Sequence, residues 1–162
     1  MKAEWVNPFI SNAISVIENL AKIKFEKTNV EIKEDTQPTN DISIIIGITG
    51  YIEGQVVYSI KEHTAQRIAT AVRPNELVVV DEAFIESSIA EIANIITGRA
   101  TIELSGDDNI IYITPPTIVI GKDYNITFVK LKTISVKLGS RFGTMEINIA
   151  IKPTEEDKDK EE

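Results

Sequence analysis

A helical periodicity between residues 82 and 98 constrains the fold of this chain more than any other feature. Isoleucine recurs there at helical spacing, at Ile85, Ile89, Ile92 and Ile96. In a helix with about 3.6 residues per turn these side chains lie on one face, and an apolar face of this length packs against other structure. We therefore expect one long helix, capped by Asp81 and extending to about Leu104, that packs on a core.

The opposite side of this helix carries a narrow polar stripe formed by Ser87, Glu91 and Asn94, at positions i, i+4 and i+7. They lie within about 60° of one another, and the stripe continues to Gly98. One interpretation is an ordinary solvent-facing surface. However, the stripe has no lysine or arginine and no i, i+4 salt bridge, and its glycine costs about 1 kcal/mol of helix stability. A carboxylate and an amide held one turn apart can bind a cation or orient a water molecule, and a small residue lets another backbone approach. The stripe is therefore the candidate site.

The remaining periodicities predict an α+β fold. Residues 7–22 have the spacing of an amphipathic helix with Asn7 as its cap and Pro8 in its first turn, and residues 65–72 predict a short helix. Segments rich in β-branched residues predict strands at 30–33, 42–49, 54–60, 110–114, 117–121, 126–131, 134–138 and 145–151. The last alternates apolar and polar residues as a half-solvated strand does. This order predicts an antiparallel or mixed sheet with the long helices packed on one face.

We expect residues 1–152 to form one domain and residues 153–162 to form an acidic, disordered tail, because TEEDKDKEE is too polar to fold. The net charge is −8. Without residues 154–162, which hold six acidic and two basic side chains, it is about −4. An acidic surface repels phosphate backbones, so nucleic-acid binding is not expected. No segment reaches about 18 uninterrupted apolar residues, so we expect a soluble cytoplasmic protein that does not bind a membrane.

Several classes of active site are excluded or disfavoured by composition. The chain has no cysteine, which removes disulfides, thiolate metal sites and cysteine nucleophiles. Its single histidine, His63, excludes a two-histidine metal site and is expected on the surface. The glycines in GITGYIEG (47–54) predict a hairpin, because the phosphate-loop ending and the following helix are missing. Residues 107–109 predict a turn, and Trp5 is expected to anchor the first helix.

The spacing Ser-x-x-x-Glu-x-x-Asn at 87–94, followed by Pro115 and Pro116, resembles the CheC/CheX/FliY family of chemotaxis phosphatases. The phrases GITGYIEGQVVYS (47–59), SSIAEIANIITGRA (87–100) and ITPPTIVIG (113–121) are similar to CheX sequences in particular. A single copy of the motif also resembles CheX, because CheC usually has two. The resemblance covers residues 5–151 and implies a CheC-like fold.

This resemblance implies an enzyme that removes the phosphoryl group from the aspartate of a CheY-like response regulator. In the family the glutamate pairs with the regulator's active-site lysine and the asparagine orients the attacking water, so these roles would pass to Glu91 and Asn94. Ser87, Gly98 and the two prolines would contribute to binding, although the prolines are also explained as an edge-strand break. The regulator holds its own Mg²⁺, so no cofactor of this chain is expected.

Two alternatives differ from this interpretation. A non-catalytic adaptor of the same fold, such as a flagellar-switch-like domain, would bind a regulator without hydrolysing it, and Asn94 favours the enzyme because an adaptor has no water to position. A small-molecule enzyme is poorly supported, because no second polar cluster is expected to converge on the helix. The resemblance also implies a homodimer formed by edge strands.

Overall fold

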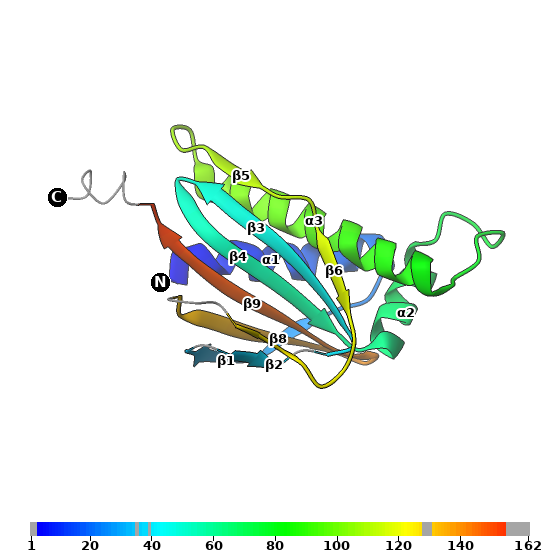
Figure 1. Cartoon of the computed structure of the whole chain (residues 1–162). Coiled ribbons are helices and arrows are strands. Elements are labelled where there is room, and N and C mark those ends of the chain that lie inside the picture. The colour runs from blue at the N-terminus through cyan, green and yellow to red at the C-terminus, as the bar shows by residue number, and fades with distance from the viewer. Residues whose placement is uncertain (1–2, 35, 39, 128–130, 155–162) are drawn as a thin grey trace.

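A seven-stranded antiparallel sheet with two long helices across one face forms the described part of the computed structural model (Figure 1). The structure describes residues 3–34, 36–38, 40–127 and 131–154, with the backbone alone for 36–38. Its helices are α1 (Ala3–Ala21), α2 (Glu62–Val72) and α3 (Glu82–Ser105). Its strands are β1 (Glu26–Lys33), β2 (Thr36–Pro38), β3 (Ile42–Gly50), β4 (Ile52–Ile60), β5 (Ile111–Ile113), β6 (Thr117–Ile120), β7 (Asn125–Thr127), β8 (Thr133–Ser140) and β9 (Gly143–Pro153). The predicted α+β class is confirmed.

The main sheet has the order β1-β8-β9-β4-β3-β5, and β6 pairs with β3 beside β5. A separate pair, β2 with β7, forms a small second sheet. Alternate residues of the central strands point toward the helices, and branched aliphatic side chains fill that face. The core between the layers includes Ile44, Ile46, Tyr58 and Ile147 from the sheet and Phe9 from α1, all at most 1% exposed. The helices therefore lie where the sequence places them, across one face of the sheet.

The second face of the sheet contradicts one prediction. Strand β9 was expected to be half-solvated, but residues 145–151 are buried throughout. Ile126 and Leu131, from the segment around β7, pack over Val57 and Ala150 on this face. The polar residues Glu146 and Asn148 of β9 are therefore buried on this face and do not meet solvent. The sequence of β9 cannot indicate this, because the covering residues are about twenty positions away in the chain.

The start of α1 is a second correction. The helix begins at Ala3, so Asn7 is not its cap and Pro8 lies inside it. Val6 is 4% exposed and Trp5 packs against the core, as expected for an anchor. We attribute the additional turn to this burial, which offsets the backbone hydrogen bond that Pro8 cannot donate.

The structure has two strand regions that the sequence pattern did not predict, because these strands form without an alternating apolar pattern. Strand β1 starts four residues earlier than predicted, and its side chains are almost all exposed. Strand β2 lies in the polar segment 34–40, between the predicted strands 30–33 and 42–49. Ladder hydrogen bonds to β8 and β7 hold these two strands. Strand periodicity arises from one-sided burial, so these strands give no such signal.

The glycine-rich segment 47–54 is the predicted hairpin. It joins β3 to β4, and Gly54 has φ 148° with no room for a Cβ against the carbonyl oxygen of Ala150. A glycine is therefore required by strand packing. At the same end of the sheet β9 ends at Pro153, which pairs with Ile52, and residues 155–162 of the expected tail lie outside the described residues. No helix in the described ranges is long and apolar enough to cross a bilayer.

Candidate functional site

The candidate site lies on α3, whose start is fixed by the predicted cap. The Oδ1 atom of Asp81 accepts a hydrogen bond of 2.9 Å from the backbone N–H of Phe84. The isoleucine face is buried, with exposed fractions of 5% or less at each of its four residues. Both features were predicted, and together they set which side of α3 faces outward.

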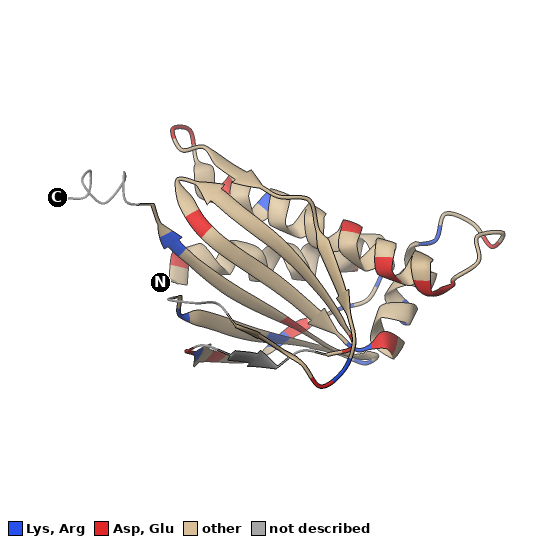
Figure 2. Ribbon diagram, viewed as in Figure 1, with Lys and Arg blue, Asp and Glu red and all other residues tan. Residues whose placement is uncertain are grey.

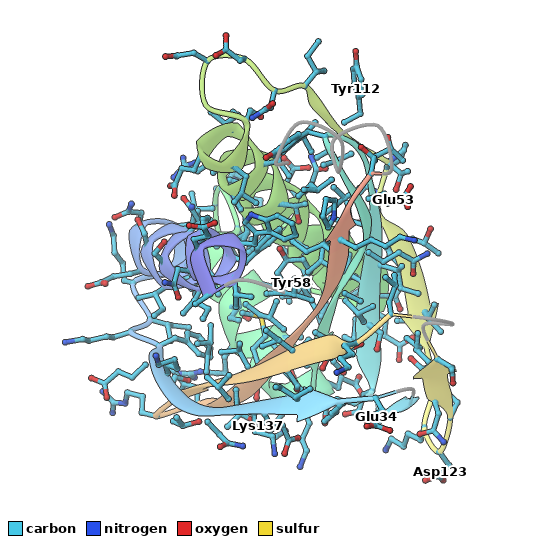
Figure 3. All side chains as sticks on the ribbon, turned by 90° about the vertical axis from the view of Figure 1, so that its left-hand side faces the viewer. Glu34, Glu53, Tyr58, Tyr112, Asp123 and Lys137 are labelled. Carbon is cyan, nitrogen blue, oxygen red and sulfur yellow. The ribbon has the colours of Figure 1, made fainter. Side chains whose placement is uncertain are left out.

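A buried hydrogen bond attaches α3 to the sheet. The hydroxyl groups of Tyr58 on β4 and Thr97 on α3 are 2.8 Å apart, in the interior between sheet and helices (Figure 3). Thr97 donates its own proton to the carbonyl oxygen of Ala93, at 2.7 Å, so Tyr58 is the donor between the two hydroxyls. Burial raises the pKa of Tyr58 far above its ordinary value, which keeps this donor protonated. The bond fixes the turn of α3 that carries Asn94.

The polar stripe is the outward side of this fixed helix. Ser87 and Glu91 are exposed, and Asn94 and Gly98 are partly buried. Within the described residues the side chains of Ser87, Glu91 and Asn94 have no hydrogen-bond or ion-pair partner. The other hydroxyl side chains of the helix behave differently, because those of Ser88, Thr97, Thr101 and Ser105 each donate to a carbonyl one turn earlier. The stripe therefore presents unused polar groups at the surface.

Gly98 is not required for packing inside the chain. A Cβ at this position would meet no atom within 4 Å, and the backbone is ordinary helix. The glycine nevertheless lowers helix stability by about 1 kcal/mol relative to alanine. The open space beside it would admit the backbone of another molecule.

The two prolines lie between β5 and β6, which pair with successive parts of β3. Thr114, just before them, donates its N–H to the carbonyl of Gly47 and accepts from the N–H of Gly47. The predicted edge-strand break is thus confirmed for Pro115 and Pro116. The broken edge runs beside α3, since both strands contact this helix.

Other candidate groups do not form a second polar site. His63 is exposed in the first turn of α2, and Asp107 and Asp108 are exposed in the predicted turn. In the described ranges no three acidic or histidine side chains are arranged to hold a metal ion. The surface position predicted for His63 and the turn predicted at residues 107–109 are confirmed.

One feature beside the stripe was missed by sequence analysis. A groove of about 390 Å³ is lined by apolar side chains from α1, α2, the loop after α2, and α3. Ser87 and Glu91 form part of its wall. Its apolar residues, hereafter the apolar groove, are Leu20, Val72, Pro74, Phe84, Ile92 and Ile95. They come from three separate stretches of sequence, so no local pattern indicates that they meet.

Comparisons with known proteins agree with this fold and site. A structure of a CheC-like superfamily protein from Shewanella sp. PV-4 superimposes with a TM-score of 0.82, at 23% identity, covering 94% of this chain and 99% of that one. The described chain therefore has the CheC-like fold. The model of the family described as chemotaxis phosphatase CheX matches residues 42–138. The chain belongs to the CheX family of chemotaxis phosphatases, and the predicted enzyme class, a phosphatase, is confirmed.

Two relatives bear on the reaction. A protein of Thermotoga maritima named CheY-P phosphatase CheX is 30% identical over 127 residues, which cover 78% of this chain and 81% of the relative. The structure of a CheX-CheY-BeF3-Mg²⁺ complex from Borrelia burgdorferi has a TM-score of 0.68 at 24% identity, covering 91% of this chain and 97% of that one.

Proposed function

We propose that this protein hydrolyses the aspartyl phosphate of a CheY-like response regulator, and that Glu91 and Asn94 carry the activity. The observation behind the proposal is that these two side chains lie one turn apart on a fixed helix, at the surface and without partners in the described residues. The Thermotoga maritima relative is named for the same reaction, and the Borrelia burgdorferi structure contains a CheY and Mg²⁺.

Asn94 is proposed to orient the attacking water. Its neutral amide can accept a hydrogen bond from the water and donate another, without repelling the phosphoryl oxygens. Water attacks phosphorus as the bond to the aspartate oxygen breaks, which releases inorganic phosphate and the regulator's carboxylate. An aspartyl phosphate is already activated, so catalysis requires chiefly a positioned water and charge stabilisation. The regulator's Mg²⁺ would supply the latter.

Glu91 is proposed to hold the regulator by pairing with its active-site lysine. The Glu91 carboxylate has no ion-pair partner among the described residues, so it is free to pair with that lysine. The Mg²⁺ ion remains bound to the regulator. Ser87 and Gly98 would border the contact, with Pro115 and Pro116 on the neighbouring edge. Association would place the half-buried Asn94 deeper in the joint surface than Glu91.

The homodimer implied by the resemblance is proposed to form through β1. This strand is one edge of the sheet, with eight mostly exposed residues that include Val30 and Ile32. The opposite edge contains Pro115 and Pro116, which have no N–H to donate to a neighbouring strand. Antiparallel pairing of two β1 edges would thus be continuous, whereas the other edge would be interrupted. The cytoplasmic location expected from the sequence belongs to the same proposal.

The test is the Mg²⁺-dependent decay of a phosphorylated CheY-type regulator with wild-type protein and with Asn94→Ala. We expect acceleration by the wild type and its loss in Asn94→Ala, while regulator binding persists. Asn7→Ala is the control, because Asn7 is also a helical asparagine but is exposed and lies at the far end of α1. If wild type binds the regulator without accelerating decay, the adaptor interpretation is correct.

A further inference from the structure

The apolar groove lies directly beside the proposed catalytic stripe. Glu91 and Ser87 belong both to the stripe and to the groove wall, so a protein seated over Glu91 also reaches the edge of the groove. The opening is bounded on its far side by Leu20 at the end of α1 and by Pro74 after α2. The docking surface is thus larger than the stripe.

Most of the groove is lined by apolar side chains, and the hydroxyl group of Ser88 in its wall is already hydrogen-bonded. Ser88, which also lines it, donates its hydroxyl proton to the carbonyl of Phe84 at 2.7 Å. Leu20 is 46% exposed, and Phe84 and Ile95 are partly buried. An unfilled apolar concavity next to a polar site is the arrangement by which protein interfaces anchor one or two side chains of a partner.

The loop between α2 and α3 extends this apolar surface. It leaves the groove at Pro74 and returns at the start of α3, and it projects beyond the helix end (Figure 1). Leu77 is 91% exposed and Val79 is 75% exposed, more than any other large apolar side chain in the described residues. Asn75 shapes the turn, since its Oδ1 accepts from the N–H of Leu77 at 2.9 Å. The loop therefore holds two apolar side chains in water, between Pro74 and Phe84, which both line the groove.

The charge of the surroundings favours one kind of occupant. The first half of α3 is acidic (Figure 2), and Glu82, Glu86 and Glu91 have no ion pair in the part of the chain that the structure describes. A second copy of this chain packed face to face here would bring the same acidic rim against itself, which is unfavourable. A regulator that offers a lysine to Glu91 complements this rim.

We propose that the apolar groove holds an apolar side-chain patch of the phosphorylated regulator, next to its aspartyl-phosphate pocket, with Leu77 and Val79 extending the contact. This inference rests on the proposed function, because it takes the regulator as the partner of Glu91. The groove and loop determine affinity and choice of regulator, whereas Asn94 acts on the reaction. Substitutions that remove apolar contacts of the groove or the loop are therefore expected to raise KM and leave kcat unchanged.

The test uses two variants on different segments, Leu20→Ser and the double variant Leu77→Ser with Val79→Ser. Dephosphorylation of a CheY-type regulator, previously phosphorylated with phosphoramidate, is followed as a function of regulator concentration. We expect KM to rise about tenfold in each, with kcat within about twofold of wild type. The control is Ile102→Ser, an α3 side chain that is 73% exposed and outside the groove, with KM unchanged. Thermal unfolding checks that every variant is folded.

Binding to the same regulator with beryllium fluoride, measured by calorimetry, separates the two proposals. If wild type binds without hydrolysis and Leu20→Ser weakens binding, the proposed function fails and the groove inference stands. The inference would be overturned if Leu20→Ser and the Leu77→Ser, Val79→Ser double variant both had the KM and the regulator affinity of the wild type. A fall in kcat at constant KM would also overturn it. A change in dimer content with Leu20→Ser, at unchanged regulator affinity, would assign the groove to a second copy of the chain.

Discussion

Two regularly spaced polar stripes have opposite environments in this molecule. On α3, Ser87, Glu91 and Asn94 follow the period of a helix and face outward without partners in the described residues. On β9, Glu146 and Asn148 follow the period of a strand and are buried, at 8% and 0% exposure. A regular polar spacing therefore identifies a face of an element, and other parts of the chain decide whether that face meets solvent.

On β9, Glu146 has polar partners on neighbouring strands, whereas Asn148 has none in the described residues. Glu146 Oε1 lies 3.1 Å from Lys33 Nζ on β1 and accepts a hydrogen bond from Ser135 on β8. Asn148, between β4 and β8, has no partner for either polar atom of its amide within the described ranges. The polar side chains of the α3 stripe face outward, so they are available to a partner protein. The amide of Asn148 is buried without a partner in the described residues, and this lowers the free energy of unfolding.

The largest effect that separates the stripes is expected from Asn94→Asp. The side chain keeps its shape, but a carboxylate repels the phosphoryl oxygens and cannot donate a hydrogen bond. We expect kcat for regulator dephosphorylation to fall about 100-fold, with the free energy of unfolding within about 0.5 kcal/mol of wild type. Phosphoryl decay and urea denaturation measure the two quantities. Activity above one tenth of wild type would contradict the proposed role.

A stability loss is expected for the other stripe with Lys33→Met. This change leaves the nearly buried Glu146 carboxylate without its cation, and we expect about 2 kcal/mol lower free energy of unfolding in urea. The control is Lys152→Met, because the Lys152–Glu53 pair is 3.2 Å long but nearly half exposed on both sides. That control should cost less than about 0.5 kcal/mol. Equal losses in the two variants would show that burial does not distinguish these pairs.

A gain in stability of about 1–2 kcal/mol is expected for Asn148→Leu. The replacement has the same branching and the same number of side-chain heavy atoms, and it removes two buried polar atoms that have no partner in the described residues. Asn148→Asp, with the same shape and an added charge, should lower the free energy of unfolding instead. Both are measured by urea denaturation. Destabilisation by leucine would mean that the amide is hydrogen-bonded in solution.

The smallest effect is expected at the end of the α3 stripe. Gly98→Ala should raise the free energy of unfolding by about 1 kcal/mol, because the new methyl group meets no atom of the described residues beyond its own stretch of helix. The same methyl group should weaken regulator binding if another backbone approaches there. Gly54→Ala is the contrasting variant and should destabilise, since Gly54 has a positive φ and abuts Ala150. Unchanged regulator binding by Gly98→Ala would remove Gly98 from the contact surface.

The sequence predicted those parts of the fold in which one element contains its own signal. The isoleucine face of α3, the Asp81 cap, the hairpin at 47–54 and the break at Pro115 were all predicted correctly. The α3 stripe was also recognised, because its residue types are unusual for a helix surface. Their roles in binding and catalysis remain predictions.

The features that were missed depend on contacts between distant segments. The cover over β9 comes from residues near β7, and the apolar groove combines Leu20 with residues of α2 and α3. The first turn of α1 forms because Val6 is buried by the rest of the core, which outweighs the local preference of Pro8. Local periodicity contains no information on such packing, so the sequence could not indicate it.

The roles of the two stripe residues are separated most directly by comparing Glu91→Ala with Asn94→Ala over a range of phosphorylated regulator concentrations. We expect Glu91→Ala to raise KM and keep most of kcat, whereas Asn94→Ala lowers kcat and leaves KM near wild type. If both variants change only KM, Asn94 is a docking residue, and the proposal that it orients the attacking water is wrong.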